Sequence, residues 1–242
     1  MPRKAQTESL ADADAAPGGA ASVDRALTLL SAFRTGDTSL SLAELAERTQ
    51  LYKSTVLRLL ASLEHARLIQ KLDDGRYALG AEVARLHGLY AAAFSLDRVV
   101  LPVLRELVAA TGESAAYHVR QGDARLCLYR VDSPHPIRDH IKAGDVLPAD
   151  RGTGARILIA FSTREQRARG QKDHQLNARI REQGYYTAVG DRLAEVAGIS
   201  APVFRADGTL AAALTLTMPA HRYVERHIKA VVRAAGKLSG EV

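Results

Sequence analysis

A short stretch near the start of the chain has residue types and a spacing that suit contact with nucleic acid. If residues 52–65 form one helix, then Ser54, Arg58 and Ser62 lie on the same side of it, with Thr55 at the flank. Arginine can hold guanine O6 and N7 with two hydrogen bonds, and short hydroxyl side chains reach phosphates or base edges. A helix amino terminus also attracts phosphate. These residues predict docking in a DNA major groove; the alternative is a merely solvated helix face.

The residues before this helix favour the DNA-binding interpretation. The opposite side of the helix is apolar, because Val56 and three leucines fall within one arc. Ser41 and Glu44 have the S-x-x-E spacing of a capping box, which predicts that a preceding helix starts there. Residues 49–51 then form the turn of a helix-turn-helix.

Residues 68–79 have the pattern of a short β-hairpin. Two stretches of strand-forming residues, 68–72 and 76–79, flank an Asp-Asp-Gly turn. Such a hairpin is the wing of a winged helix-turn-helix, and Arg76 is expected where the wing meets a neighbouring phosphate. An exposed hairpin charge is the alternative for this residue. The candidate DNA-binding residues are Tyr52, Lys53, Ser54, Thr55, Arg58, Ser62 and Arg76.

A further helix over residues 22–33 completes this winged helix-turn-helix domain, which is expected to span residues 20–80. Its predicted apolar stripe consists of Val23, Ala26, Leu27, Leu30 and Phe33. Residues 1–19 are rich in Ala, Asp and Gly and have no continuous apolar segment. They are expected to form a disordered arm and not a signal peptide.

Composition narrows the class of protein. The 242 residues allow one large domain or two ordinary ones, and no apolar run reaches the roughly 20 residues of a membrane span. The single cysteine, Cys127, excludes an internal disulfide and fits a reducing cytoplasm. The net charge of +6 suits a nucleic-acid partner. However, residues 20–80 hold eight basic and seven acidic residues, so individual charges must identify the DNA-binding surface.

The rest of the chain predicts a linker helix over residues 81–95 and an α+β domain over residues 96–242. Hairpins and helices alternate there, which implies an antiparallel sheet flanked by helices. The expected hairpins are 114–119 with 125–131 and 198–204 with 210–217, and the expected helices are 96–111, 153–161 and 223–238.

Two threonines of the last hairpin could line a polar cavity. Thr215 and Thr217 share one strand face, while Leu214 and Leu216 share the other. One face must pack on helices, so the hydroxyls could face a cavity on the opposite side. The alternative is that the threonines simply favour β structure and face solvent.

Other candidate sites have no supporting motif. His118, His135 and His140 match no common spacing of metal ligands, and Cys127 lies in an apolar strand as a small buried side chain would. The sequence has no nucleophile elbow, Walker loop or dinucleotide fingerprint. No metal, other cofactor or catalytic residue is therefore predicted.

Several segments occur in the order and at the spacing of a known family. In the first domain they are SVDRALTLLSAF, SLAELAERTQL, KSTVLRLLASLE and GRYALG. With these segments the chain resembles the IclR-type bacterial transcription regulators, although Tyr52 stands where the family commonly has proline or a small polar residue. GDVLPADRGTGARILIAF, REQGYYTAVGD and GISAPVFRADGTLAAALTLTMPAHR resemble segments of the family's effector-binding domain. Between these segments, residues 161–184 form a shorter connection than is usual.

The resemblance implies a GAF-like effector domain with a ligand cup over one sheet face. Ala155 takes a position that is usually glycine, with Gly154 just before it. Mapped onto this sequence, the effector-binding residues are Leu147, Thr153, Gly154, Ala155, Asp191, Val196, Gly198, Ser200, Thr215 and Thr217.

The leading hypothesis is a ligand-responsive transcription regulator, repressor or activator, that acts in the cytoplasm on a double-stranded operator. One short helix reads few bases, so a homodimer or homotetramer on a palindromic operator is expected. The basic surplus of the second half would suit an organic or aromatic acid as effector. Two alternatives remain open: an enzyme for the same small molecule with an appended DNA-binding domain, and a constitutive DNA-binding protein whose second domain only dimerises.

Overall fold

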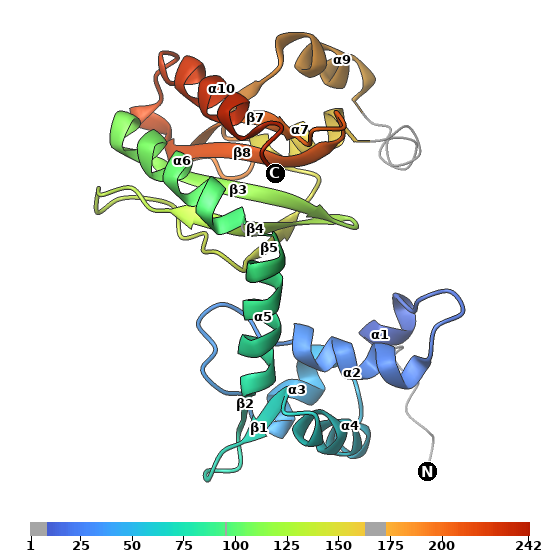
Figure 1. Cartoon of the computed structure of the whole chain (residues 1–242). Coiled ribbons are helices and arrows are strands. Elements are labelled where there is room, and N and C mark those ends of the chain that lie inside the picture. Colours follow the sequence, from blue (N-terminus) through green and yellow to red (C-terminus); the bar gives the residue numbers. More distant parts are fainter. Residues whose placement is uncertain (1–8, 95, 163–172) are drawn as a thin grey trace. The chain divides into compact units, whose positions relative to one another are not determined.

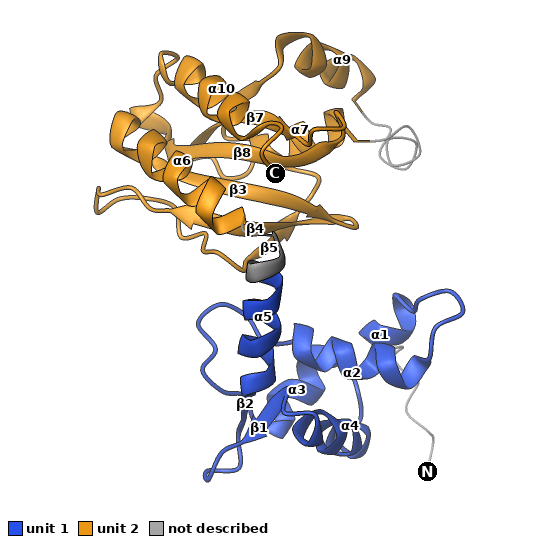
Figure 2. Cartoon of the chain, viewed as in Figure 1, with its two compact units in different colours: residues 1–93 blue, residues 94–242 orange. Residues whose placement is uncertain are grey.

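The computed structural model describes residues 9–94, 96–162 and 173–242. The chain divides into two compact units, residues 1–93 and residues 94–242 (Figure 2).

The first unit is a winged helix-turn-helix, as the sequence predicted. Its core is formed by apolar side chains from three of its helices, those over residues 21–31, 42–49 and 53–65, and from the hairpin, including Leu29, Leu45, Val56, Leu60 and Ile69. The elements, labelled in Figure 1, are α1 (Leu10–Ala13), α2 (Ala21–Ser31), α3 (Leu42–Thr49), α4 (Lys53–His65), β1 (Ile69–Lys71), β2 (Tyr77–Leu79) and α5 (Ala81–Phe94).

The predicted capping box starts α3. The Ser41 hydroxyl accepts a hydrogen bond from the Glu44 amide, and the Glu44 carboxylate accepts one from the Ser41 amide at 2.7 Å. At the other end Gln50 has a left-handed backbone conformation, with φ of 58°, and closes the helix. The turn before α4 is therefore made without a glycine.

The apolar stripe of α2 differs from the predicted one. Val23 and Leu27 are 53% and 52% exposed, whereas Leu29 is fully buried. Ala26, Leu30 and Phe33 pack against the core as expected, so the observed stripe has the i, i+3, i+4, i+7 spacing over residues 26–33. Two overlapping stripes fitted the helical period, and packing against α3 and α4 selects the one that contains Leu29.

Part of the predicted disordered arm is helical. Ser9 accepts a hydrogen bond from the Asp12 amide at the start of α1, and Asp12 forms an ion pair with Arg25 of α2 at 2.8 Å. Residues 1–8 lie outside the described residues.

The second unit is a six-stranded antiparallel sheet with helices on both faces. The strand order is β5-β4-β3-β8-β7-β6. The strands are β3 (Ser114–Gln121), β4 (Ala124–Val131), β5 (Val146–Pro148), β6 (Tyr186–Val189), β7 (Val196–Phe204) and β8 (Leu210–Pro219). The helices are α6 (Leu96–Thr111), α7 (Thr153–Ala160), α9 (His174–Gln183), the short 3-10 helix η1 (Ala220–Arg222) and α10 (His227–Leu238).

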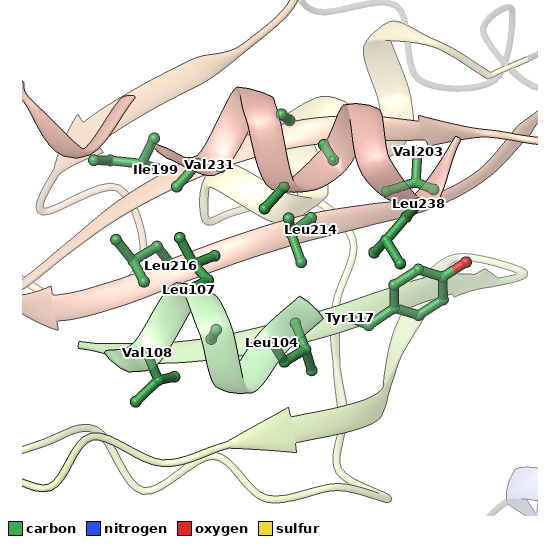
Figure 3. Packing of buried hydrophobic residues seen from close by; sticks show 14 of the residues in the cluster. Leu104, Leu107, Val108, Tyr117, Ile199, Val203, Leu214, Leu216, Val231 and Leu238 are labelled. Carbon is green, nitrogen blue, oxygen red and sulfur yellow. The ribbon is translucent and has the colours of Figure 1, made fainter. Parts of the chain in front are cut away.

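The main core lies between one sheet face and the helices α6 and α10. Figure 3 shows Leu104 and Leu107 of α6 and Val231 of α10 among side chains of the sheet, including Leu214 and Leu216. The opposite face carries Thr215, Ser200 and Gly198 and is covered in part by α7. The expected division between leucine and threonine faces of β8 is thus observed.

A β-bulge changes which side chains of β4 share a face. Tyr117 pairs with Tyr129, but the next residue, His118, pairs with Cys127, so Leu128 is an extra residue. Residues that pair directly point to the same side of a sheet. The bulge therefore puts Arg130 on the same side as Cys127, although simple alternation would separate them.

Candidate functional site

The predicted DNA-binding side of α4 is open to solvent. The side chains of Lys53, Ser54, Arg58 and Ser62 are exposed and that of Thr55 is half-buried. In the described parts of the chain no hydrogen bond or ion pair engages them. We call these residues, with Tyr52, the α4 face.

The start of α4 is free to meet an anion. Tyr52 is the N-cap residue, and its side chain makes no capping hydrogen bond. The first backbone N–H groups of a helix have no partner within the helix, so an uncapped start can donate to phosphate. Tyr52 is 65% exposed and does not block this end of the helix with a capping contact.

Arg76 contacts its own domain. Its Nη2 donates to the Ser39 carbonyl at 2.9 Å and to the Glu44 carboxylate at 3.0 Å, and its Nε donates to the Ser39 hydroxyl. The Ser41 backbone amide, the Ser41 side chain and Arg76 together hold the pKa of Glu44 below its ordinary value. The alternative of a merely exposed charge therefore does not describe Arg76. A phosphate contact by this residue stays a prediction.

A second candidate site is a cavity between the sheet and the start of α7. Its volume is about 350 Å³, including the part that is open to solvent. Seven of the ten predicted effector-binding residues line it: Thr153, Gly154, Asp191, Val196, Gly198, Thr215 and Thr217.

The other three predicted residues do not line the cavity. Leu147 packs against the apolar cluster that contains Cys127, and Ala155 is buried within α7. Ser200 is fully buried, and its hydroxyl donates to Thr153 Oγ1 at 2.8 Å and is hydrogen bonded to Thr215 Oγ1 at 2.9 Å. Ser200 therefore holds two lining hydroxyls in place without lining the cavity itself.

Six lining residues were not predicted. They are His118, Arg125, Ile141, Gly152, Ala188 and Arg192. His118 was weighed only as a metal ligand, and the arginines only as part of a basic surplus. Alternation from Cys127 would have placed Arg125 on the same face of β4, but only the sheet order shows that this face meets α7.

Two glycines permit the close approach of α7 to the sheet. A Cβ atom on Gly198 would lie 2.5 Å from Thr153 Oγ1. A Cβ atom on Gly154 would lie 2.8 Å from Thr215 Oγ1. Both distances are shorter than van der Waals contact, so any larger residue would push the helix from the sheet.

Buried ion pairs surround the cavity. Asp139 is paired with Arg130 and, at 3.2 Å, with Arg192. Asp191 accepts hydrogen bonds from Arg156 and from the Gly152 amide at 2.9 Å. Burial opposes the charge on Arg130, but its two aspartate partners outweigh burial and raise its pKa. Asp191 therefore lines the cavity and also fixes the start of α7.

Two lining groups have strongly lowered pKa values. Burial, and then the charge of Arg192, lower the pKa of Arg125 to about 10, which still leaves it protonated at neutral pH. Burial, followed by the charges of three arginines, lowers the pKa of His118 well below its ordinary value, so its imidazole is neutral. The cavity therefore contains a charged guanidinium beside an uncharged imidazole.

Within the described residues, no group of three or more His, Cys, Asp or Glu side chains is placed to hold a metal ion. In the same residues, no helix is both long enough and apolar enough to cross a membrane.

Both halves of the chain match models of one family. Residues 22–73 match the IclR helix-turn-helix domain, and residues 89–241 match the model described as bacterial transcriptional regulator IclR C-terminal. The chain is 28% identical over 245 residues to the HTH-type transcriptional regulator BhcR of Paracoccus denitrificans, covering 92% of this chain and 87% of that protein. A shorter match to the regulator KipR of Bacillus subtilis, 27% identical, covers 53% of this chain and only about half (51%) of that relative.

Solved structures of the same family have the same fold. An IclR transcriptional regulator from Silicibacter sp. TM1040 is 26% identical, with a TM-score of 0.76, and the match covers 91% of this chain and 95% of that one. An IclR homologue from Microbacterium hydrocarbonoxydans, complexed with 4-hydroxybenzoate, is 21% identical with a TM-score of 0.79, over 90% of this chain and 97% of that one. Together with the two domain matches, this fold similarity leads to one conclusion: the chain belongs to the IclR family of bacterial transcription regulators.

Proposed function

We propose that this regulator reads its operator through the α4 face and that a small molecule in the cavity beside α7 alters its affinity for DNA. The observation that carries the proposal is the α4 face itself, where two cations and the hydroxyls of Ser54 and Ser62 are exposed and form no hydrogen bond or ion pair with described residues. A major-groove helix needs such a surface, because its side chains must be free to exchange water for base edges and phosphates.

The cavity supports the regulatory half of the proposal. It is lined by hydroxyls, two arginines and a histidine, which can fix the orientation of a small polar molecule. The presence of 4-hydroxybenzoate in a similar structure supports an organic or aromatic acid as the class of effector. A ligand shifts DNA affinity only if it binds one of two conformations more tightly, and α5 is the covalent connection through which such a change would act.

Self-association completes the proposal. Leu10, Val23 and Leu27 in the first unit and Leu86 and Leu89 on α5 are exposed apolar side chains. Their exposure supports burial against a second copy of the chain. A two-fold dimer would read half-sites about 34 Å apart, or a multiple of that, in the cytoplasm where the chromosome lies.

The DNA half is tested with Arg58→Ala. The operator is first selected from a random duplex library with the native protein. Loss of one bidentate base contact should then reduce the preference for operator over random duplex by about tenfold to a hundredfold. Glu64→Ala, an exposed change on another side of α4, is the control. Unchanged discrimination by Arg58→Ala would remove Arg58 from the site.

The effector half is tested with Thr215→Val. This change should weaken ligand binding in calorimetry while the apo protein keeps its operator affinity. Unaltered ligand binding would remove Thr215 from the ligand site.

The two alternative functions predict different experimental results. Chemical turnover of a bound ligand would favour an enzyme with a DNA-binding domain. Operator affinity that no bound ligand changes would favour a constitutive DNA-binding protein.

A further inference from the structure

Arg125 is a buried arginine without a carboxylate partner. It is 2% exposed, and no carboxylate of the described residues lies within 4.0 Å of its guanidinium nitrogens. Its one hydrogen bond to that part of the chain runs from Nε to the Pro148 carbonyl, at a long 3.3 Å. A buried charge that lacks a partner is strongly unfavourable, so Arg125 needs an explanation.

The two aspartates whose charges act on Arg125 form ion pairs with other arginines. Asp139 and Asp191 both favour its charged form through space. Asp139, however, pairs with Arg130 and Arg192, and Asp191 pairs with Arg156 at 3.1 Å. The charge of one guanidinium is therefore left without a contacting counter-charge at this wall of the cavity.

The surroundings of Arg125 increase the positive potential. A Cβ atom on Gly152 would lie 3.0 Å from Arg125 Nη2, and one on Gly154 would lie 3.1 Å from Nη1. The guanidinium thus lies against the first turn of α7, where the helix dipole is also positive. Gly152 is the N-cap residue of α7 and supplies no capping side chain. The Asp191 carboxylate already accepts from the Gly152 amide at this end of the helix, so Arg125 is the group that would favour an added anion here.

Neutral groups beside the arginine also lack partners. His118 is buried, and neither of its ring nitrogens has a hydrogen-bond partner in the described structure. The same holds for the hydroxyl of Thr217. Native proteins rarely leave buried polar atoms unsatisfied, because each such atom loses its hydrogen bond to water. Both residues line the cavity, so a bound molecule could satisfy them.

We infer that the cavity takes a small monocarboxylate bearing one neutral oxygen substituent, a hydroxyl or oxo group. Arg125 supplies the counter-charge for the carboxylate, and His118 and Thr217 bind the substituent. One carboxylate balances the one unpaired guanidinium, whereas a dianion would leave an uncompensated negative charge. This assignment of ligand class and specificity residues rests on the proposed role of the domain as a ligand sensor.

The first experiment compares charged and uncharged ligands by calorimetry on the full chain. Lactate, pyruvate and 4-hydroxybenzoate are each paired with the corresponding amide, and inorganic phosphate is added as a different anion. At least one carboxylate should bind, with its amide at least a hundredfold weaker. Binding of an amide within threefold of its acid, binding of phosphate alone, or no binding by all three carboxylates would overturn the inference.

The second experiment changes the arginine. Arg125→Met should abolish binding of the carboxylate, and Arg125→Lys should restore part of it. Arg120→Met, on the neighbouring strand with an exposed hydrogen bond, is the control and should bind normally. The melting temperature of unliganded Arg125→Met should be no lower than that of the native protein. This result would show that the variant folds and has lost only the ligand site. If this variant does not fold, Arg125→Lys and the acid–amide pairs on the native protein decide the question. Native-like affinity in a folded Arg125→Met would overturn the inference.

The third experiment addresses the substituent. The native protein should bind lactate more tightly than propionate, or 4-hydroxybenzoate more tightly than benzoate. Thr217→Val removes the hydroxyl with little change of volume. This variant should reduce the preference to about twofold or less. An unchanged preference would show that Thr217 does not read the substituent. Carboxylate binding that leaves operator affinity unaltered would refute the proposed regulatory function but leave the anion site intact.

Discussion

Arginines and hydroxyls are prominent in both candidate sites of this chain, but in opposite environments. On the α4 face their side chains form no hydrogen bond or ion pair with described residues, whereas around the cavity all but Thr217 are held in ion pairs or hydrogen bonds, Arg125 by a single long hydrogen bond. Water and salt screen an exposed charge, so leaving it unpaired costs little. A buried charge must have a partner. Residues of the α4 face should therefore be separable from folding, and the ion-paired residues around the cavity should not.

The largest difference between the exposed α4 face and the buried interior of the second unit should be in the reactivity of a cysteine thiol. Burial raises the pKa of Cys127 to about 12, so at pH 8 its thiolate fraction is about 10⁻⁴. A cysteine introduced by Ser62→Cys on the α4 face should have an ordinary pKa and react with iodoacetamide about a thousandfold faster. Mass spectrometry over time measures both rates, with the urea-unfolded protein as the control in which the two become equal. Similar rates in the folded protein would contradict the buried position of Cys127.

The next largest effect should be the loss of stability when Asp139, which pairs with two arginines, is replaced. Asp139→Asn would leave the buried Arg130 and Arg192 without a shared counter-charge, and should lower the free energy of unfolding by about 3 kcal/mol. Urea denaturation provides the measurement. Glu106→Gln breaks an exposed pair with Lys237 and should cost less than about 1 kcal/mol. Equal losses in the two variants would remove the distinction between buried and exposed pairs.

Filling the close contact between α7 and the sheet should have a smaller effect on stability. Gly198→Ala would bring a Cβ atom within 2.5 Å of Thr153 Oγ1 and should destabilise the second unit by about 1–3 kcal/mol. Gly88→Ala is the matched control, because Gly88 lies in α5 with no atom near its added Cβ. The control should stabilise by up to about 1 kcal/mol, through higher helix propensity. Thermal unfolding compares the two, and a Gly198→Ala protein as stable as the native one would show that α7 can shift.

The smallest effect should be the stability change of Arg58→Ala. Its guanidinium is exposed and forms no hydrogen bond or ion pair with the described residues, so the free energy of unfolding should change by no more than about 0.5 kcal/mol. Urea denaturation checks this. A loss comparable to that of Asp139→Asn would mean that the α4 face also holds the domain together.

Local patterns predicted the first unit well. The capping box at Ser41 and the apolar arc of α4 are contained in a few neighbouring residues, and both occur as expected. The stripe of α2 was harder, because Leu27 and Leu29 both fit a helical period and only the neighbouring helices decide between them. Arg76 was placed on the hairpin correctly, but its contact with Glu44 joins residues 32 positions apart.

The cavity was only partly predictable for a similar reason. Two of its hydroxyls, those of Thr215 and Thr217, follow from alternation along β8. Its charges depend on tertiary pairing, because Asp139 comes from a loop and the bulge at Leu128 places Arg130 on the same face as Cys127. A sequence cannot distinguish a paired arginine from an unpaired one, and this difference identifies Arg125.

The carboxylate of Glu44 has a consequence for how the DNA-binding unit opens. It accepts hydrogen bonds from the Ser41 amide and from Arg76, so one group ties the first turn of α3 to the wing. Segments that share such a link tend to unfold locally as one cooperative element. Amide protons of the α3 start and of β2 should then exchange with deuterium at matching rates, and Glu44→Gln should accelerate both together. The wing would be as rigid as the helix that it is tied to, so the spacing between its proposed phosphate contact and the α4 face would be preserved during the search along DNA.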